Sequence, residues 1–141
     1  AQIKELASQC SHPVHFLGKL NHEELATALR VSDLFVLPSF FEGLPLVIME
    51  ALACGAKVIC NDLPGISLWV EERISNHGIL FPSLPPMEKI DEPDPASLPD
   101  YEQLLARTIE KALLSTQKKQ ADLSQVTWDG LARYILDLVQ L

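Results

Sequence analysis

The sequence is poor in the residues that mark several common classes of protein. Its 141 residues include three cysteines, an odd number with no CxxC or other metal-ligand spacing. Neither a disulfide framework nor a zinc site is therefore expected, and Cys10, Cys54 and Cys60 are predicted to be free thiols in a reducing compartment. The four histidines are scattered along the chain and show no ligand spacing either. We expect no bound metal ion.

Positive charge is also scarce. Eleven lysines and arginines stand against nineteen acidic residues, which gives a formal net charge of -8. Such a surface repels nucleic-acid phosphates and anionic lipid headgroups, so nucleic acid is not expected as a partner. A single phosphate group held by backbone N–H groups is compatible with this charge, because that binding is local.

Long uninterrupted apolar runs are missing as well. The most apolar stretch, Leu44 to Cys60, is broken by Pro45, Glu50, Gly55 and Lys57. No membrane-spanning helix is therefore expected. No basic segment followed by an apolar stretch opens the chain, so no signal peptide is expected. These observations predict a cytoplasmic protein, with peripheral membrane attachment left open for the full-length form.

What the chain does have is the composition of a globular α/β protein. Hydrophobic residues make up 48% and charged residues 21%, and the length predicts a single domain over residues 1–141. Short apolar segments alternate with segments of helical spacing, which predicts a Rossmann-like parallel sheet with helices on both faces. Strands are expected at 14–18, 33–38, 57–61 and 77–82, and helices at 21–32, 45–54 and 66–74.

The composition changes after residue 82. Residues 82–99 contain six prolines and several acidic residues, which predicts an irregular surface loop. Two helices are expected to end the chain, because apolar residues recur at helical spacing from Leu104 to Leu113 and again from Trp128 to Val139. Both apolar stripes are expected to face the core.

The segment from Ser39 to Glu50 is the candidate for chemistry. Its first half is a loop that follows a predicted strand, and ligands of parallel α/β sheets bind beyond the carboxyl ends of the strands. Pro45 is expected at the first position of the next helix. The free N–H groups and the dipole of a helix N-terminus attract phosphate. Gly43 would let the backbone approach a ligand closely and would accept unusual dihedral angles.

Two carboxylates bracket this expected anion site. Glu42 precedes the helix, and Glu50 lies about one and a half turns into it. Glu50 stands in an otherwise apolar stretch, where a buried carboxylate needs hydrogen-bond donors. Ribose hydroxyls would be such donors, so phosphate between two acceptors fits a nucleotide-sugar. The alternative is that both glutamates are ordinary surface residues, and their spacing alone does not decide between the two.

The stretch from Val36 to Ile59 resembles the signature block of the retaining GT-B glycosyltransferases of family 4. That block has two glutamates separated by seven residues, followed by a glycine and a short apolar strand. The flanking segments Val14–Gly18 and Asn61–Gly65 agree with it, and Thr127-Trp128 resembles the tryptophan-bearing last helix of the family. The resemblance implies the C-terminal, nucleotide-sugar-binding half of a GT-B fold.

The resemblance also implies roles for single residues. Glu42 would be the catalytic residue, contacting hydroxyls of the transferred sugar and stabilising positive charge at the anomeric carbon. Glu50 would accept hydrogen bonds from the ribose, and backbone N–H groups around Gly43 and Leu44 would touch the diphosphate or the sugar. The donor would be a UDP-, GDP- or ADP-sugar. No separate cofactor and no metal would be needed.

A second domain is implied that this chain does not contain. The family places its active site between two Rossmann-like domains, and the chain corresponds to the later part of the second. The acceptor (a glycan, lipid or small molecule), the basic diphosphate ligands and any general base would be held outside it, so the chain alone is expected to be inactive. Two alternatives stay open: a noncatalytic nucleotide-sugar-binding or protein-interaction module, and a related sugar phosphorylase or epimerase.

Overall fold

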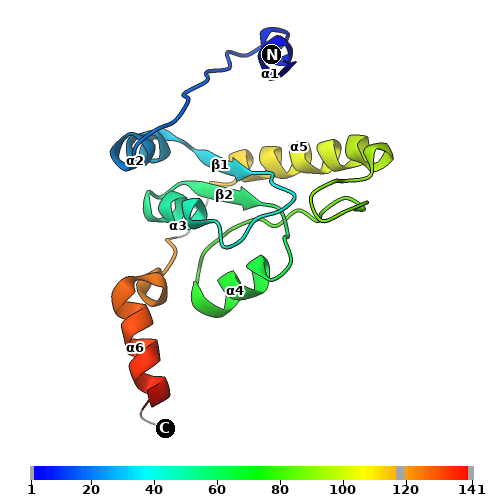
Figure 1. Ribbon diagram of the computed structural model, residues 1–141. Coiled ribbons are helices and arrows are strands. Elements are labelled where there is room, and N and C mark those ends of the chain that lie inside the picture. The colour runs from blue at the N-terminus through cyan, green and yellow to red at the C-terminus, as the bar shows by residue number, and fades with distance from the viewer. Residues whose placement is uncertain (1, 117–119, 140–141) are drawn as a thin grey trace.

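The computed structural model describes the backbone of residues 2–116 and 120–139. The predicted α/β class with a parallel sheet is confirmed (Figure 1). In chain order the helices and strands are α1 (Gln2–Ser8), α2 (His22–Val31), β1 (Leu34–Leu37), α3 (Leu46–Ala53), β2 (Lys57–Cys60), α4 (Ile66–Arg73), the 3₁₀ helix η1 (Pro95–Ser97), α5 (Leu98–Leu114), the 3₁₀ helix η2 (Ser124–Val126) and α6 (Trp128–Val139).

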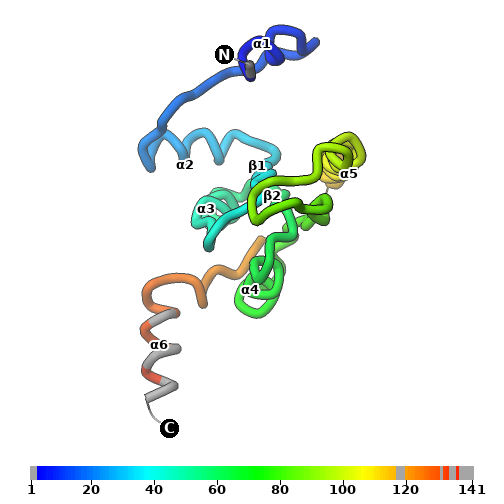
Figure 2. The backbone as a smooth tube through the Cα atoms, turned by 45° about the vertical axis from the view of Figure 1, so that its right-hand side comes forward, coloured from blue at the N-terminus to red at the C-terminus, as the bar shows by residue number. Residues whose placement is uncertain are grey.

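The two strands of the sheet run parallel, with Leu34 opposite Lys57 and Leu37 opposite Cys60. Helix α3 lies on one side of them and α5 on the other (Figure 2). The fully buried side chains come mainly from α3, β2 and α4: Ile48, Val58, Ile59, Cys60, Leu63, Val70 and Ile74. The core therefore lies between the sheet and the helices that follow its strands.

The expected strand at 77–82 is reduced to a single parallel bridge between Ile59 and Leu80. The N–H of Leu80 donates to the Val58 oxygen at 3.0 Å, and the N–H of Cys60 donates to the Leu80 oxygen at 3.1 Å. The next bond of a parallel ladder would need an N–H from Pro82, and proline has none. The ladder is therefore interrupted after one bridge, although the segment still runs beside the end of β2, where the N–H of Asp62 donates to the Pro82 oxygen at 2.9 Å.

The expected strand at 14–18 is wrong. This segment has no secondary structure, and Val14, Phe16 and Leu17 are exposed. It leads from α1, a helix that the sequence pattern did not predict and that lies apart from the sheet, to α2 (Figure 1). An apolar pattern forms a strand only where a neighbouring strand offers hydrogen-bonding groups, and nothing in the described part of this chain pairs with it.

Local signals placed the helices around the candidate site. Asn21 caps α2 through a capping box: its side chain accepts from the Glu24 N–H at 3.0 Å, and the Glu24 carboxylate accepts from the Asn21 N–H at 2.9 Å. Helix α3 begins one residue later than expected, so Pro45 is its N-cap. Gly55 ends α3 with a φ of 80°, a backbone conformation that glycine adopts readily.

The Pro-rich segment ends earlier than its composition suggests. A bridge between Met87 and Pro93 folds it back on itself, and α5 already begins at Leu98. Tyr101 and Ala112 of α5 are buried, but Leu104 and Leu113 of the predicted apolar stripe are exposed, so the expectation that this stripe faces the core is met only in part. Lys57 ties its C-terminal end to β2, because the ammonium group donates to the Ala112 oxygen at 2.7 Å.

The core-facing role expected for the last apolar stripe is wrong where it can be checked. Trp128 is 86% exposed and Ala132 is exposed as well, and α6 extends away from the sheet (Figures 1 and 2). The side chains of the remaining stripe residues, Leu131, Ile135, Leu138 and Val139, lie outside the described residues. Helical spacing shows that a helix has an apolar face, but it does not show which surface covers that face.

Candidate functional site

The candidate site lies at the carboxyl edge of the sheet, where the loop of residues 38–45 joins β1 to α3. This edge is where parallel α/β sheets bind ligands, because loops and helix N-termini converge there. Glu42 is exposed in this loop, and its Oε1 accepts a hydrogen bond from the Ser39 hydroxyl at 2.8 Å. Gly43 and Leu44 follow it and are exposed too. The structure thus presents all three residues in front of α3.

Gly43 does not have the unusual backbone conformation that the sequence suggested. Its φ is not positive, unlike that of Gly55 or Gly65. A Cβ atom at Gly43 would come within 4 Å of no described atom beyond its chain neighbours. The fold itself therefore does not require glycine at this position. Close approach of a ligand to Gly43 stays a prediction.

A pocket of about 320 Å³ opens beside Glu42. Its walls come from three segments: the loop after β1, the turn after β2 and the Pro-rich segment. The lining is mostly apolar, with one carboxylate and one ammonium group, and consists of Phe40, Phe41, Glu42, Leu63, Pro64, Leu84, Met87, Lys89 and Ile90. Lys89 is also paired with Glu92, at 2.6 Å. The Pro-rich segment, expected only as a surface loop, therefore forms part of the site.

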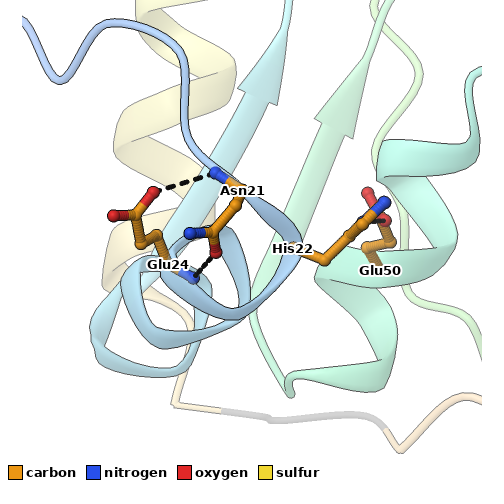
Figure 3. A network of polar contacts seen from close by, with 4 residues as sticks. All are labelled: Asn21, His22, Glu24 and Glu50. Carbon is orange, nitrogen blue, oxygen red and sulfur yellow. Dashed lines mark hydrogen bonds and ion pairs between the residues drawn. The ribbon is translucent and has the colours of Figure 1, made fainter.

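Glu50 lies on the side of α3 that faces α2 (Figure 3). Its side chain is 39% exposed, and His22 Nδ1 lies 3.4 Å from its Oε1. The sequence argument assumed a buried carboxylate in need of donors, and the structure corrects that premise. Glu50 is partly exposed and has the imidazole of His22, the first residue of α2, beside it. The N-terminus of α2 thus lies beside the middle of α3.

The charge of Glu42 reaches the end of β2. The pKa of the Cys60 thiol is raised to about 11, mainly by burial and also by the negative charges of Glu42 and Asp62. Cys60 is fully buried. Within the described ranges, no group of three or more histidine, cysteine or acidic side chains is arranged to hold a metal ion.

The structure adds residues that sequence reasoning did not assign to the site. His22 stands beside Glu50, and Ser39 holds Glu42. Asn61 and Tyr101 connect to the same loop from β2 and α5. Ser39 was within reach of sequence reasoning, since it begins the segment that the sequence singled out and stands three residues before Glu42. The other three meet the site only through the fold.

Comparison with known proteins agrees with the geometry. A family described as "Glycosyl transferases group 1" matches residues 1–91 of the 141. A protein named as a teichuronic acid biosynthesis glycosyltransferase of Bacillus subtilis is 42% identical over 64 residues, which are 45% of this chain and 16% of that relative. No solved structure matches the chain significantly.

Two further relatives carry different substrates in their names. The N,N'-diacetylbacillosaminyl-diphospho-undecaprenol alpha-1,3-N-acetylgalactosaminyltransferase of Campylobacter jejuni is 40% identical over 66 residues, 47% of this chain and 16% of the relative. The D-inositol 3-phosphate glycosyltransferase of Mycobacterium bovis is 39% identical over 62 residues, 44% of this chain and 13% of the relative. The matched part of this chain thus spans about a sixth of these relatives or less.

No helix in the described ranges combines the length and the apolarity that crossing a bilayer requires.

The candidate site lies in the matched region, at the edge where this class of sheet binds its ligands. The family match covers more than half of the chain and includes Glu42, Gly43, Leu44 and Glu50. The chain belongs to the glycosyl transferases group 1 family.

Proposed function

We propose that this chain is the donor-binding part of a glycosyltransferase that moves a sugar from a nucleotide-sugar to an acceptor hydroxyl with retention of configuration. The observation that carries the proposal is the convergence of three features at one edge of the sheet. These are the Glu42 loop, the N-terminus of α3, and Glu50 beside the N-terminus of α2. Together they offer sites for a sugar, a phosphate and a ribose.

The diphosphate would bind in front of α3. The first N–H groups of a helix have no intrahelical acceptor, and the helix dipole adds a partial positive charge. Pro45 contributes no N–H, so Gly43, Leu44 and the first residues of α3 would be the donors. These donors would also stabilise the charge of the diphosphate as it leaves, which lowers the barrier of the transfer. No cofactor beyond the donor substrate is proposed.

Glu42 would act on the sugar. It lines the pocket in front of the loop, where its carboxylate would accept hydrogen bonds from sugar hydroxyls and face the anomeric carbon. Retention would follow if the acceptor hydroxyl attacks from the face that the diphosphate leaves. In that geometry Glu42 would orient the sugar and stabilise the positive charge that develops on it.

Glu50 would hold the ribose. A carboxylate that is partly exposed and flanked by one imidazole keeps acceptor capacity for two hydroxyl groups. His22 would stay beside it and limit the rotation of the carboxylate.

The acceptor would be a glycan, a lipid or a small molecule bound by another part of the full-length protein. The names of the relatives point to a teichuronic acid, an undecaprenol-linked sugar and an inositol phosphate. Relatives that share this segment thus use different acceptors. This supports the view that the segment handles the donor and that acceptor choice is made elsewhere.

A calorimetric binding experiment on the full-length protein tests the proposal. UDP, GDP and ADP are titrated in turn, and the nucleotide that binds is then titrated into Glu50→Ala. Loss of hydrogen bonds to a charged group should weaken binding by about 1–3 kcal/mol. Glu102→Ala, which removes an exposed glutamate of α5, is the matched control and should bind normally. Unchanged affinity in Glu50→Ala, or no binding of any of the three by the wild type, would contradict the proposal.

A further inference from the structure

Three hydrogen bonds connect helix α5 to the carboxylate of Glu42. The Tyr101 hydroxyl donates to Asn61 Oδ1 at 2.9 Å, and Asn61 Nδ2 donates to the backbone oxygen of Ser39 at 3.0 Å. The Ser39 hydroxyl then donates to Glu42 Oε1 at 2.8 Å. These three bonds, which we call the relay, join residues that are far apart in the sequence. The relay ends on the carboxylate that lines the pocket.

Asn61 is the central member, and its burial gives the contacts their weight. It is 0% exposed and is the buried polar residue of the described core. A buried amide is costly unless both of its ends are paired. The Ser39 oxygen can only accept, so Asn61 must present its NH₂ group there and its oxygen to Tyr101. The side-chain amide therefore has one favourable orientation. The backbone N–H of Asn61 also donates a hydrogen bond, to the backbone oxygen of Leu37 at 3.3 Å.

Tyr101 holds the loop at a second point. Its ring lies 5.4 Å from the ring of Phe40, at an interplanar angle of 56°, a favourable tilted arrangement. Phe40 and Glu42 both line the 320 Å³ pocket. One residue of α5 thus contacts the loop through a ring and through a hydrogen-bonded amide.

The hydroxyl of Tyr101 keeps its proton over the physiological range. Burial raises the pKa of Tyr101, although the hydrogen bond to Asn61 acts in the opposite direction. Since Tyr101 is 7% exposed, water does not compete freely for this bond. The Tyr101 hydroxyl therefore remains a hydrogen-bond donor to Asn61 at neutral pH.

We infer that Tyr101, Asn61 and Ser39 are positioning residues that fix the loop and one oxygen of Glu42, leaving the second oxygen free for a sugar hydroxyl. This inference rests on the proposed function and goes beyond it by assigning three residues that do not touch the donor. The bond from Ser39 removes rotational freedom from the carboxylate before a ligand arrives. Such preorganisation matters because small misplacements of a catalytic group are costly.

The first test uses the ligand-free full-length protein. Tyr101→Phe keeps the ring and its contact with Phe40 but removes the hydroxyl and leaves Asn61 Oδ1 without its donor. Amide hydrogen exchange in residues 38–44 should become faster by roughly three- to tenfold, the effect of losing one hydrogen bond. Exchange in α2 should not change. Thr108→Ala, which removes a hydroxyl bond to Leu104 on the same helix, is the control and should leave the loop unaffected.

The second test asks whether the relay acts on the sugar. UDP-glucose, GDP-mannose and ADP-glucose are compared with UDP, GDP and ADP, and the ratio of the two affinities for the pair that binds measures the contribution of the sugar. Ser39→Ala and Tyr101→Phe should lower this ratio about three- to tenfold, while the affinity for the bare nucleotide stays constant. Ser39→Thr, which retains a hydroxyl, should restore most of the ratio. A general loss of stability would not change the ratio selectively.

Glu42→Gln distinguishes a failure of the relay from a failure of the proposed role of Glu42. If Glu42→Gln lowers the ratio and the Ser39 and Tyr101 variants do not, the relay is overturned while the proposed function stands. If Glu42→Gln leaves the ratio unchanged, the proposed role of Glu42 fails, and the relay then positions nothing catalytic. Unchanged exchange of residues 38–44 in Tyr101→Phe would overturn the relay by itself.

Discussion

Cys60 lies fully buried at the end of β2, close enough to the site for the charges of Glu42 and Asp62 to affect it. Burial is the largest cause that raises its pKa, from 9.0 to about 11. The thiol also donates to the Asn61 oxygen at 3.3 Å. Cys60 is therefore a natural probe of the carboxyl edge of the sheet, because its reactivity depends on burial and on nearby charge.

The pKa of Cys60 predicts its reaction with iodoacetamide. At pH 8 its alkylation in the native full-length protein should be at least roughly a hundredfold slower than in denaturant, since two pH units separate the folded and unfolded pKa values. Peptide mapping by mass spectrometry identifies the modified cysteine. Exposed Cys10 is the internal control and should react at similar rates in both states. Equal native rates for Cys60 and Cys10 would show that the thiol is not buried.

The same pKa difference has a consequence for stability. A thiol whose pKa is raised by folding remains neutral in the native state at a pH where the unfolded chain already ionises. Its contribution to stability is therefore fully present below pH 9 and is lost as the pH rises from 9 toward 11. Cys60→Ala should flatten this part of the stability profile in a denaturation series.

At the residue scale, the sequence identified one short candidate segment but not the residues from other parts of the chain that contact it. Glu42, Gly43, Leu44 and Glu50 stand in one short segment, and the structure places them at one edge of the sheet. His22, Asn61 and Tyr101 meet that segment from other parts of the chain. Nothing in their local sequence distinguishes them, because their contacts depend on how α2, β2 and α5 pack.

The elements differ in how far local sequence determines them. Helix α2 has its own start signal, a reciprocal pair of hydrogen bonds between Asn21 and Glu24 (Figure 3). The predicted strand at 14–18 has only an apolar pattern and stays unpaired. A helix satisfies its own backbone groups, whereas a strand depends on a neighbour. The bounds of α2, α3 and α4 were therefore predicted within about a residue, whereas α1, the start of α5 and the outer strands were not.

The capping box of α2 predicts a measurable effect on stability. Asn21→Ala removes the side-chain acceptor for the Glu24 N–H and should lower the free energy of unfolding by about 0.5–2 kcal/mol. Chemical denaturation of the full-length protein measures the change. Asn21→Asp retains an acceptor at the same place and should recover most of the stability. A loss in Asn21→Asp as large as that in Asn21→Ala would mean that the cap does not stabilise α2.

At the scale of the whole molecule, the candidate site is built along one edge of the sheet. The carboxyl edge of the sheet carries the Glu42 loop, the N-terminus of α3 and a mostly apolar pocket. The matched region spans about a sixth of the relatives' length or less. The α/β class and the parallel sheet followed from the alternation of apolar and helical segments. The direction of α6 did not, because an amphipathic pattern does not identify the surface that covers it.

We propose above that the segment from Ser39 to Glu50 binds the nucleotide-sugar donor. Hydrogen–deuterium exchange of the full-length protein, with and without a saturating nucleotide-sugar, tests it most directly. Donor binding at this segment should protect the amides of residues 39–50 and of the N-terminus of α2 from exchange. Glu50→Ala should remove the protection at α2 first. Protection confined to other parts of the protein, with residues 39–50 unchanged while the donor is bound, would contradict the account.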